Sequence, residues 1–288
     1  MTPSRRTRTL YVTGKGGAGK SFITALLARE AARRGVRTAV VELVDEQPSP
    51  EDTEPPKSAW LRRIVLDQRA ALAHLLTRLL RLPVVARRLL DSRTFSAVSA
   101  AAPGVKEIVY LSYLRDLACG RTPHCVDLVL VNGLASGHSR ALLLAPERIG
   151  RLVPLGPVSS VVGETASFVT DEARFRVAVV TTPEELAVSE TEELHDVLAQ
   201  AGVPVTATVV NGVYPPRLTV EQLKWVRDHD ASSDAMLYMN RRARQLALAE
   251  RVASPAGQPL LLPYFFGSSP LEARTRGRLY EALVGGWS

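Results

Sequence analysis

The chain has 288 residues, of which 46% are hydrophobic and 23% are charged. This composition excludes a disordered or fibrous protein, and a chain of this length can bury enough apolar surface to fold without disulfide bonds. The 36 Lys and Arg residues exceed the 29 Asp and Glu residues, and a net charge of +7 by itself would suggest a nucleic-acid partner.

The distribution of the basic residues argues against that partner. Only five of them are lysines, and the remainder are arginines scattered along the chain rather than gathered in one tract. The lysines are Lys15, Lys20, Lys57, Lys106 and Lys224. Two of the five lie within one eight-residue loop, so the scarce residue is concentrated where we expect chemistry.

Cysteine content and hydropathy predict a cytoplasmic protein. Cys119 and Cys125 cannot form a disulfide framework, and the apolar run near the N-terminus is too short for a secretion signal. No stretch reaches the roughly 20 apolar residues that a membrane span requires. We therefore expect no transmembrane segment.

The first elements predicted along the chain form a β-α-β unit. Residues 9–13 are a β-rich run, a glycine-rich loop follows, and residues 20–34 have a helical pattern that ends at Gly35. A second strand is predicted at 38–44. Residues 45–58 contain four prolines and five acidic residues, and we predict a mobile loop there because this composition cannot bury apolar surface.

Residues 67–120 are predicted to form an inserted helical subdomain. Leucines recur every three or four residues, Pro83 restarts a helix, and Pro103-Gly104 breaks the chain again. The leucine stripe fits either the internal core of this subdomain or an exposed surface for a cargo or partner.

Four further buried-type strands follow, at 126–131, 177–181, 205–210 and 260–262. Helix start signals are predicted at Thr182, with Pro183 as the first helical residue, and at Thr219 in a capping-box pattern. A terminal helix at 270–284 fits a sheet-covering helix or a membrane-surface anchor. The six strands predict an α/β fold with a doubly wound, mostly parallel sheet, in a single domain over residues 1–288.

The loop between the first strand and helix satisfies the pattern G-x-x-x-x-G-K-[ST], in the strand-loop-helix context that a phosphate-binding loop requires. Its glycines let backbone N–H groups surround phosphate oxygens, Lys20 can reach the β and γ phosphates, and Ser21 can bind Mg²⁺. We therefore predict ATP and Mg²⁺ as ligands. The predicted nucleotide-binding residues here are Gly14, Lys15, Gly16, Gly17, Ala18, Gly19, Lys20, Ser21 and Phe22.

Lys15, one position after the first glycine, makes the loop resemble that of the deviant Walker A family, which includes the arsenite-pump ATPase ArsA, the tail-anchored-protein targeting ATPase, MinD and ParA. In that family this lysine contacts nucleotide phosphate across a dimer interface. The resemblance implies an ATP-dependent dimer in which Lys15 and Lys20 are catalytic.

The ArsA branch is the most similar over most of the chain. Residues 101–107 resemble its A-A-P-G-x-K-E, residues 136–138 resemble its T-G-H, and residues 180–185 resemble its V-T-x-P-E-E. The resemblance further implies that Asn211 reads the edge of adenine and that Pro263 belongs to the loop that closes over it.

Two departures from the family concern metal and water. Where the family has an Asp that supports hydrated Mg²⁺, this chain has Asn132, which lacks the charge, so we expect weaker metal binding and slower turnover. The Asp that orients the attacking water aligns only with a one-residue slip, which makes Asp45 the better candidate and Glu42 the weaker one. Both could also be ordinary acids at a strand end.

The features that assign cargo within the family are missing. There is no C-x-x-C pair, only three methionines are present, and two cysteines are too few for a three-thiolate arsenite site. The cargo or membrane partner is therefore not identified by the sequence.

Three functions follow from these observations. The first is an ArsA-type, Mg²⁺-dependent ATPase that dimerises with nucleotide and hydrolyses ATP slowly. The second is a hydrolysis-deficient nucleotide-binding subunit that regulates an active ArsA-like paralogue in a heterodimer. The third is a positioning ATPase similar to ParA or MinD.

Overall fold

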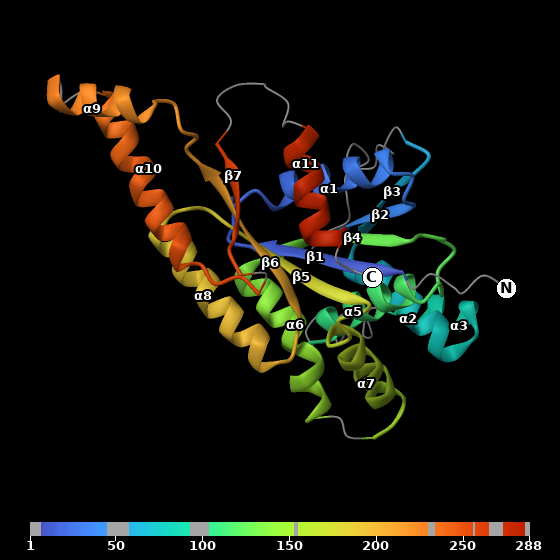
Figure 1. Cartoon of the computed structure of the whole chain (residues 1–288). Coiled ribbons are helices and arrows are strands. Elements are labelled where there is room, and N and C mark those ends of the chain that lie inside the picture. The colour runs from blue at the N-terminus through green and yellow to red at the C-terminus, as the bar shows by residue number, and fades with distance from the viewer. Residues whose placement is uncertain are drawn as a thin grey trace.

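The computed structural model describes residues 7–44, 58–92, 104–152, 155–229, 234–255, 257–264 and 273–285. Within them the chain builds one sheet of seven strands in the order β3-β2-β4-β1-β5-β6-β7, and every neighbouring pair is parallel (Figure 1). The strands are β1 (Arg8–Gly14), β2 (Thr38–Leu43), β3 (Leu61–Leu66), β4 (Leu128–Ala135), β5 (Phe175–Thr181), β6 (Val205–Val213) and β7 (Leu260–Pro263).

Helices cover both faces of this sheet. They are α1 (Lys20–Arg33), α2 (Gln68–Leu80), α3 (Pro83–Asp91), α5 (Val105–Ala118), α6 (Ser136–Gly150), α7 (Pro157–Val169), α8 (Glu185–Gln200), α9 (Val220–His229), α10 (Asp234–Arg251) and α11 (Ala273–Tyr280), with a π-helical turn, η2, at Glu281–Gly285. A parallel sheet needs such crossover helices, so its central strands are buried on both faces and are mostly apolar, with a few buried threonines such as Thr9 and Thr13.

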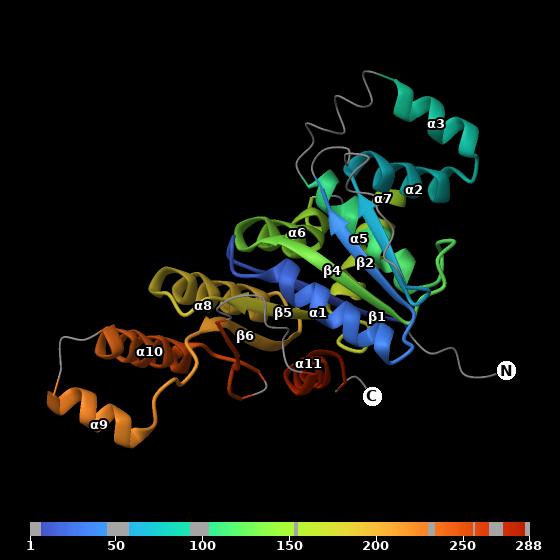
Figure 2. The same ribbon diagram turned by 90° about the horizontal axis from the view of Figure 1, so that it is seen from above.

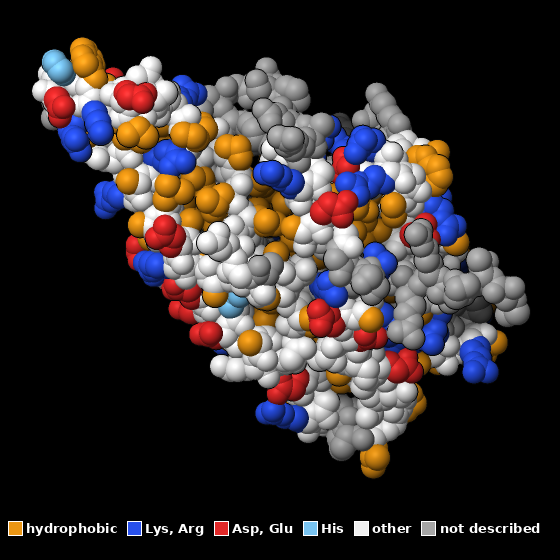
Figure 3. Space-filling view, in the orientation of Figure 1, with side chains coloured by type: hydrophobic (Ala, Val, Ile, Leu, Met, Phe, Trp, Pro, Cys, Tyr) orange, Lys and Arg blue, Asp and Glu red, His pale blue; other side chains and the backbone are white. Residues whose placement is uncertain are grey.

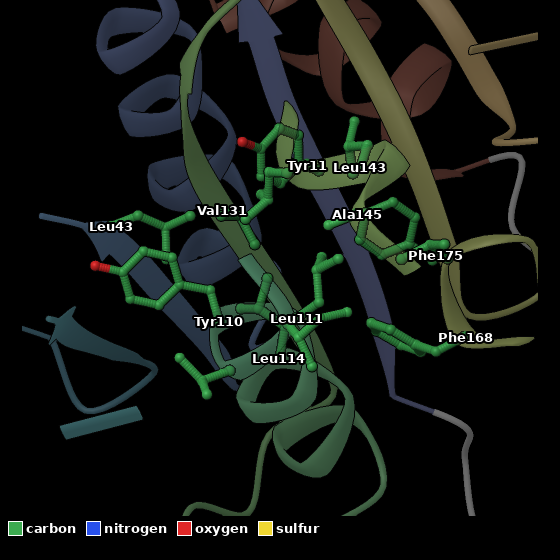
Figure 4. Packing of buried hydrophobic residues seen from close by; sticks show 14 of the residues in the cluster. Tyr11, Leu43, Tyr110, Leu111, Leu114, Val131, Leu143, Ala145, Phe168 and Phe175 are labelled. Carbon is green, nitrogen blue, oxygen red and sulfur yellow. The ribbon is translucent and has the colours of Figure 1, made fainter. Parts of the chain in front are cut away.

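Two apolar clusters hold the layers together. On one face, Tyr11 and Val131 of the sheet pack with Leu111 and Leu114 of α5 and with Phe175 (Figure 4). This cluster also takes in buried residues of α2, α3, α6, α7 and α8. On the other face, α1, α11 and η2 pack against alternate residues of the same strands. Because successive side chains of a strand point to opposite faces of the sheet, neighbouring residues of one strand belong to different clusters.

The predicted α/β fold with a doubly wound sheet is confirmed, and the sheet has one strand more than the six that were predicted. The additional strand, β3, is an edge strand that pairs only with β2. Its sequence carries Arg62 and Arg63 in the middle, so it lacks the apolar run of the central strands, and pairing with β2 rather than local pattern determines its structure.

The helices within the range 67–120 are α2, α3 and α5. All three contribute to the same apolar cluster as the sheet. The separate status of that segment as a subdomain stays a prediction. Of the predicted loop at 45–58, residues 45–57 lie outside the described residues, as do residues 101–103 and 270–272.

One helix start is confirmed and another is wrong. At α9, Thr219 Oγ1 accepts a hydrogen bond from the Gln222 backbone N–H, while the Gln222 side chain accepts from the Thr219 N–H. At α8, the helix begins at Glu185 with Glu184 as an extended N-cap that makes no side-chain cap, so Thr182 is not the cap. Residues 182–184 form a turn there, closed by the Glu184 N–H to Thr182 carbonyl bond.

Two helical parts stand at opposite ends of the molecule. Figure 2 shows α3 at one extremity and the antiparallel pair α9 and α10 at the other. The inner half of α10 packs on α8 and β6 through Ala249, whereas α9 buries no residue. The carboxyl ends of the strands lie between these two parts.

Candidate nucleotide-binding site

The phosphate loop connects the central strand β1 to α1, and glycine is required at both ends of it. Gly14 has φ +145°, and a Cβ there would lie 1.8 Å from the Val180 carbonyl oxygen of the neighbouring strand β5. Gly19 is the N-cap of α1 with φ 99°, and a Cβ there would lie 2.3 Å from Nδ2 of Asn211. Only glycine fits both positions, so the loop passes closely over the ends of β5 and β6.

The N-terminus of α1 is prepared for an anion. It has no side-chain cap and no acidic residue in its first turn, so its first N–H groups and its dipole are available to phosphate oxygens. The Lys20 Nζ donates to the carbonyl oxygens of Gly14 (3.2 Å) and Lys15 (3.1 Å). Burial lowers the pKa of Lys20. Lys20 therefore lies over the loop, where a phosphate oxygen could replace a carbonyl.

Lys15 has a different partner. Its Nζ lies 3.3 Å from Oε1 of Glu190 on α8, and its side chain is 27% exposed. The other carboxylate oxygen of Glu190 accepts a hydrogen bond from Ser136 Oγ at 3.2 Å, at the first residue of α6. One carboxylate thus connects the phosphate loop to the segment that resembles the T-G-H motif.

The predicted metal residues Ser21 and Asn132 are brought together. Ser21 Oγ lies 3.1 Å from Nδ2 and 3.3 Å from Oδ1 of Asn132 at the end of β4. Both residues line a cavity of about 220 Å³ that also includes Glu42 and Arg63. Hydroxyl, amide and carboxylate oxygens are ligands that Mg²⁺ accepts, so this donor set fits the ion.

Glu42 reaches this cavity because β2 pairs with β4 so that Glu42 is the register partner of Asn132. Its carboxylate is neutralised by Arg63 of β3, with Nη2 to Oε2 at 2.6 Å. The favoured candidate for a water-facing carboxylate, Asp45, lies outside the described residues, so its role stays a prediction.

A larger cavity, of about 780 Å³, lies on the other side of the phosphate loop. Asn211 reaches it from the end of β6 and donates to the Ala18 carbonyl at 3.0 Å. Tyr264 lines the cavity directly after Pro263, which ends β7 and is not among the lining residues. The other lining residues are Gly17, Thr182, Pro183, Glu184, Glu185, Gly212, Tyr214, Arg241, Arg244, Gln245, Ala247, Leu248 and Arg251.

The dimensions and lining of this cavity suit a nucleoside. Tyr214 packs edge-on against Tyr264, with ring centroids 5.8 Å apart, and Gln245 accepts a hydrogen bond from the Tyr214 N–H. An aromatic wall, an asparagine amide and a glutamine amide provide stacking and hydrogen bonding for a base. Sequence reasoning missed Tyr214, Tyr264 and Gln245 because no local pattern marks them.

The described parts of the chain also bear on metal clusters, cysteines and membrane spans. In these ranges no three His, Cys, Asp or Glu residues gather as a metal-binding cluster. Cys119 and Cys125 are free thiols. No helix among the described residues is both long and apolar enough to span a membrane.

Comparison with known proteins finds similarity to nucleotide-binding domains and ATPases. Residues 10–246 match the family model of the CobQ/CobB/MinD/ParA nucleotide binding domain. The chain is 25% identical over 253 residues to the ATPase BagA of Mycobacterium tuberculosis, which covers 81% of this chain and 74% of that protein.

Two further relatives match in part. A protein of Halobacterium salinarum named "Putative arsenical pump-driving ATPase" is 25% identical over 287 residues, covering 91% of this chain and 42% of that protein. An uncharacterized protein of Streptomyces coelicolor is 31% identical over 156 residues, covering 50% of this chain and 38% of that protein.

Proposed function

Because the chain belongs to the CobQ/CobB/MinD/ParA nucleotide-binding domain family, we propose that it is an ATP-binding, Mg²⁺-dependent ATPase of the ArsA type. It works as a nucleotide-dependent dimer and hydrolyses ATP slowly. The observation that carries this proposal is the phosphate loop, which places Lys15 and Lys20 beside the uncapped N-terminus of α1.

Each part of the site has a task in this proposal. The loop amides and Lys20 bind the phosphates. Asn211, Tyr214 and Tyr264 hold the base in the larger cavity. Ser21 would hold Mg²⁺, with Asn132 and Glu42 beside it. When bound, the ion neutralises charge on the phosphates. The ArsA assignment is supported by residues 182–185, which resemble part of the V-T-x-P-E-E motif of that branch and line the larger cavity.

The dimer follows from Lys15. If Lys15 acts on the partner's nucleotide, it must leave Glu190, because the ion pair holds it against its own α8. The test is light scattering of the purified protein with and without ATP and Mg²⁺. We expect a monomer to become a dimer in the wild-type protein and to stay a monomer in Lys15→Ala. A mass that is independent of nucleotide contradicts the dimer.

A second candidate function is a hydrolysis-deficient subunit that regulates an active paralogue. It is favoured by Asn132, which brings no charge to the metal cavity, and by Glu42, whose charge is matched by Arg63. The assay is ATP turnover by the protein alone, with Lys20→Ala as the background. Turnover that disappears in Lys20→Ala contradicts the regulatory function, whereas tight ATP binding without turnover supports it.

A further inference from the structure

The corner between α2 and α3 exposes apolar side chains at one extremity of the molecule (Figure 2). Leu82, which joins the two helices, is 58% exposed, and Val84 on the first turn of α3 is 68% exposed. Leu79, Leu80 and Val85 are also exposed. Together these five residues form what we call the corner patch. The opposite side of α3 buries Ala86 and Leu90, so the helix is anchored while Val84 and Val85 stay exposed.

The corner patch is surrounded by cations. Residues 77–90 contain four arginines and no acidic residue. Arg81, Arg87 and Arg88 are exposed and form no ion pair with any residue in the described ranges. Arg78, in contrast, turns inward and binds the buried Asp116 at 3.0 Å. Three exposed arginines that have no ion pair in the described ranges therefore lie in the same segment as the exposed Leu and Val side chains.

The backbone of the corner is defined and places these groups together. Arg81 ends α2 in the left-handed conformation with φ 53°, and its N–H bonds the Thr77 carbonyl at 3.0 Å. Glycine would adopt this conformation with less strain, yet the position carries a cation. Leu82 then accepts the first hydrogen bonds of α3, from the N–H groups of Val85 and Ala86. The apolar and cationic groups thus protrude from a short, hydrogen-bonded connection.

The α9–α10 pair at the opposite end provides an internal comparison. It also exposes large apolar side chains, which gather over α9 and α10 in Figure 3. Trp225 is 61% exposed and Leu237 is 65% exposed. Acidic residues are interspersed there, namely Glu221, Asp228 and Asp234. Exposed apolar area with arginines nearby is therefore common to both ends, because residues 235–249 of α10 also carry three arginines and no acidic residue. The ends differ in α9, which adds the acidic residues Glu221 and Asp228 beside Trp225, whereas the one acid of α3, Asp91, is paired with Arg69.

We propose that the corner patch docks on an anionic lipid surface, with its Leu and Val side chains in the interfacial layer and Arg81, Arg87 and Arg88 at the headgroups. A convex patch with unpaired arginines suits a membrane surface, because long arginine stems can lie beside apolar groups while the guanidinium groups bind phosphate. Anionic lipid attracts such cations over about one Debye length. This interaction is independent of the nucleotide site and adds a location to the proposed ATPase.

The test is flotation of the full-length protein, without nucleotide, with vesicles of phosphatidylcholine alone or mixed with phosphatidylglycerol. We expect binding only to the mixed vesicles and loss of binding as salt rises. Arg87→Gln with Arg88→Gln should weaken binding on the order of 20-fold, at roughly fivefold per arginine. Leu82→Glu should weaken it about tenfold or more. The matched controls Leu237→Glu and Arg227→Gln should bind as the wild type does.

Thermal melting of each variant shows whether it folds, and the arginine variants alter only exposed groups. The proposal is overturned if the wild type does not bind mixed vesicles at low salt, or if it binds both kinds of vesicle equally. It is also overturned if Leu237→Glu weakens binding as much as Leu82→Glu. Capture of an amphipathic peptide or self-association through Leu82, without vesicle binding, would assign the corner patch to a protein partner instead. Because no nucleotide is present, failure of the ATPase proposal leaves this result unchanged.

Discussion

The strands β6 and β4 both present an asparagine beside the phosphate loop, and the two asparagines have different surroundings. Asn211 lines the large cavity and donates a hydrogen bond to an uncharged group, the Ala18 carbonyl. Asn132 contacts Ser21 in the small cavity, which Glu42 and Arg63 also line. A neutral amide suits the first position, because it can donate to a carbonyl and accept from a base.

The same amide at the second position brings no charge to a divalent cation. In the function that we propose, nucleotide binding therefore depends on β1, α1 and β6, whereas metal activation depends on β4 and β2. Binding should be strong while turnover is slow. Five substitutions test this separation, and they follow in order of decreasing effect.

Lys20→Ala should affect binding most. It removes a partly buried cation from the phosphate loop, and charge-assisted hydrogen bonds contribute about 1.5–3 kcal/mol each. We expect the Kd for ATP to rise on the order of 100-fold in calorimetric titration. Lys224→Ala on α9 is the matched control and should bind normally. Equal affinity for ATP in both variants would contradict a role of Lys20 and the phosphate loop in binding.

Asn132→Asp should affect turnover rather than ATP affinity. A carboxylate next to Ser21 strengthens Mg²⁺ binding, so we expect about a tenfold rise in kcat, which corresponds to about 1.4 kcal/mol. The measurement is steady-state phosphate release as a function of Mg²⁺ concentration. Asn240→Asp, exposed on α10, controls for added negative charge. If the two variants have the same rate, Asn132 does not limit the activity.

Glu42 and Arg63 should have opposite effects on the same measurement. Glu42→Gln removes the carboxylate that lines the small cavity. The Mg²⁺ concentration needed for half-maximal phosphate release should therefore rise several-fold. Arg63→Gln releases the Glu42 carboxylate from its 2.6 Å ion pair and should lower that Mg²⁺ concentration. Effects in the same direction would indicate that the pair only stabilises the edge of the sheet.

Glu190→Gln should have the smallest effect, because a partly exposed ion pair contributes up to about 1 kcal/mol. Releasing Lys15 should favour the MgATP-dependent dimer by about fivefold or less. Sedimentation velocity at several protein concentrations measures the shift, with Glu193→Gln on the same helix as control. A weaker dimer in Glu190→Gln would instead mean that Glu190 holds Lys15 in its working position.

Sequence alone predicted the parts of this site that are local. The phosphate loop, its strand and its helix are contiguous, and Asn132 and Asn211 lie in the carboxyl-terminal halves of the buried strands β4 and β6, whose carboxyl ends meet at one edge. Their proximity could be expected because parallel strands align their ends. The start of α9 was also readable, since its capping box lies within four residues.

The missed features depend on distant segments. Glu190 is one of several acidic residues on α8, and only the packing of that helix brings it to Lys15. Tyr214 and Tyr264 become one wall because β6 pairs with β7. Arg63 is in the site because β3 adds to the edge of the sheet, and its pairing with β2 is not encoded in the alternation of its own residues.

The most direct test of the separation between binding and turnover is a single-turnover experiment with protein in excess over labelled ATP and Mg²⁺. Bound nucleotide and released phosphate are measured in the same samples over time. We expect the wild type to retain nearly all ATP and to hydrolyse it slowly, and Asn132→Asp to retain it equally but to hydrolyse it faster. Failure to retain ATP, or equal hydrolysis rates in the two proteins, would contradict the account.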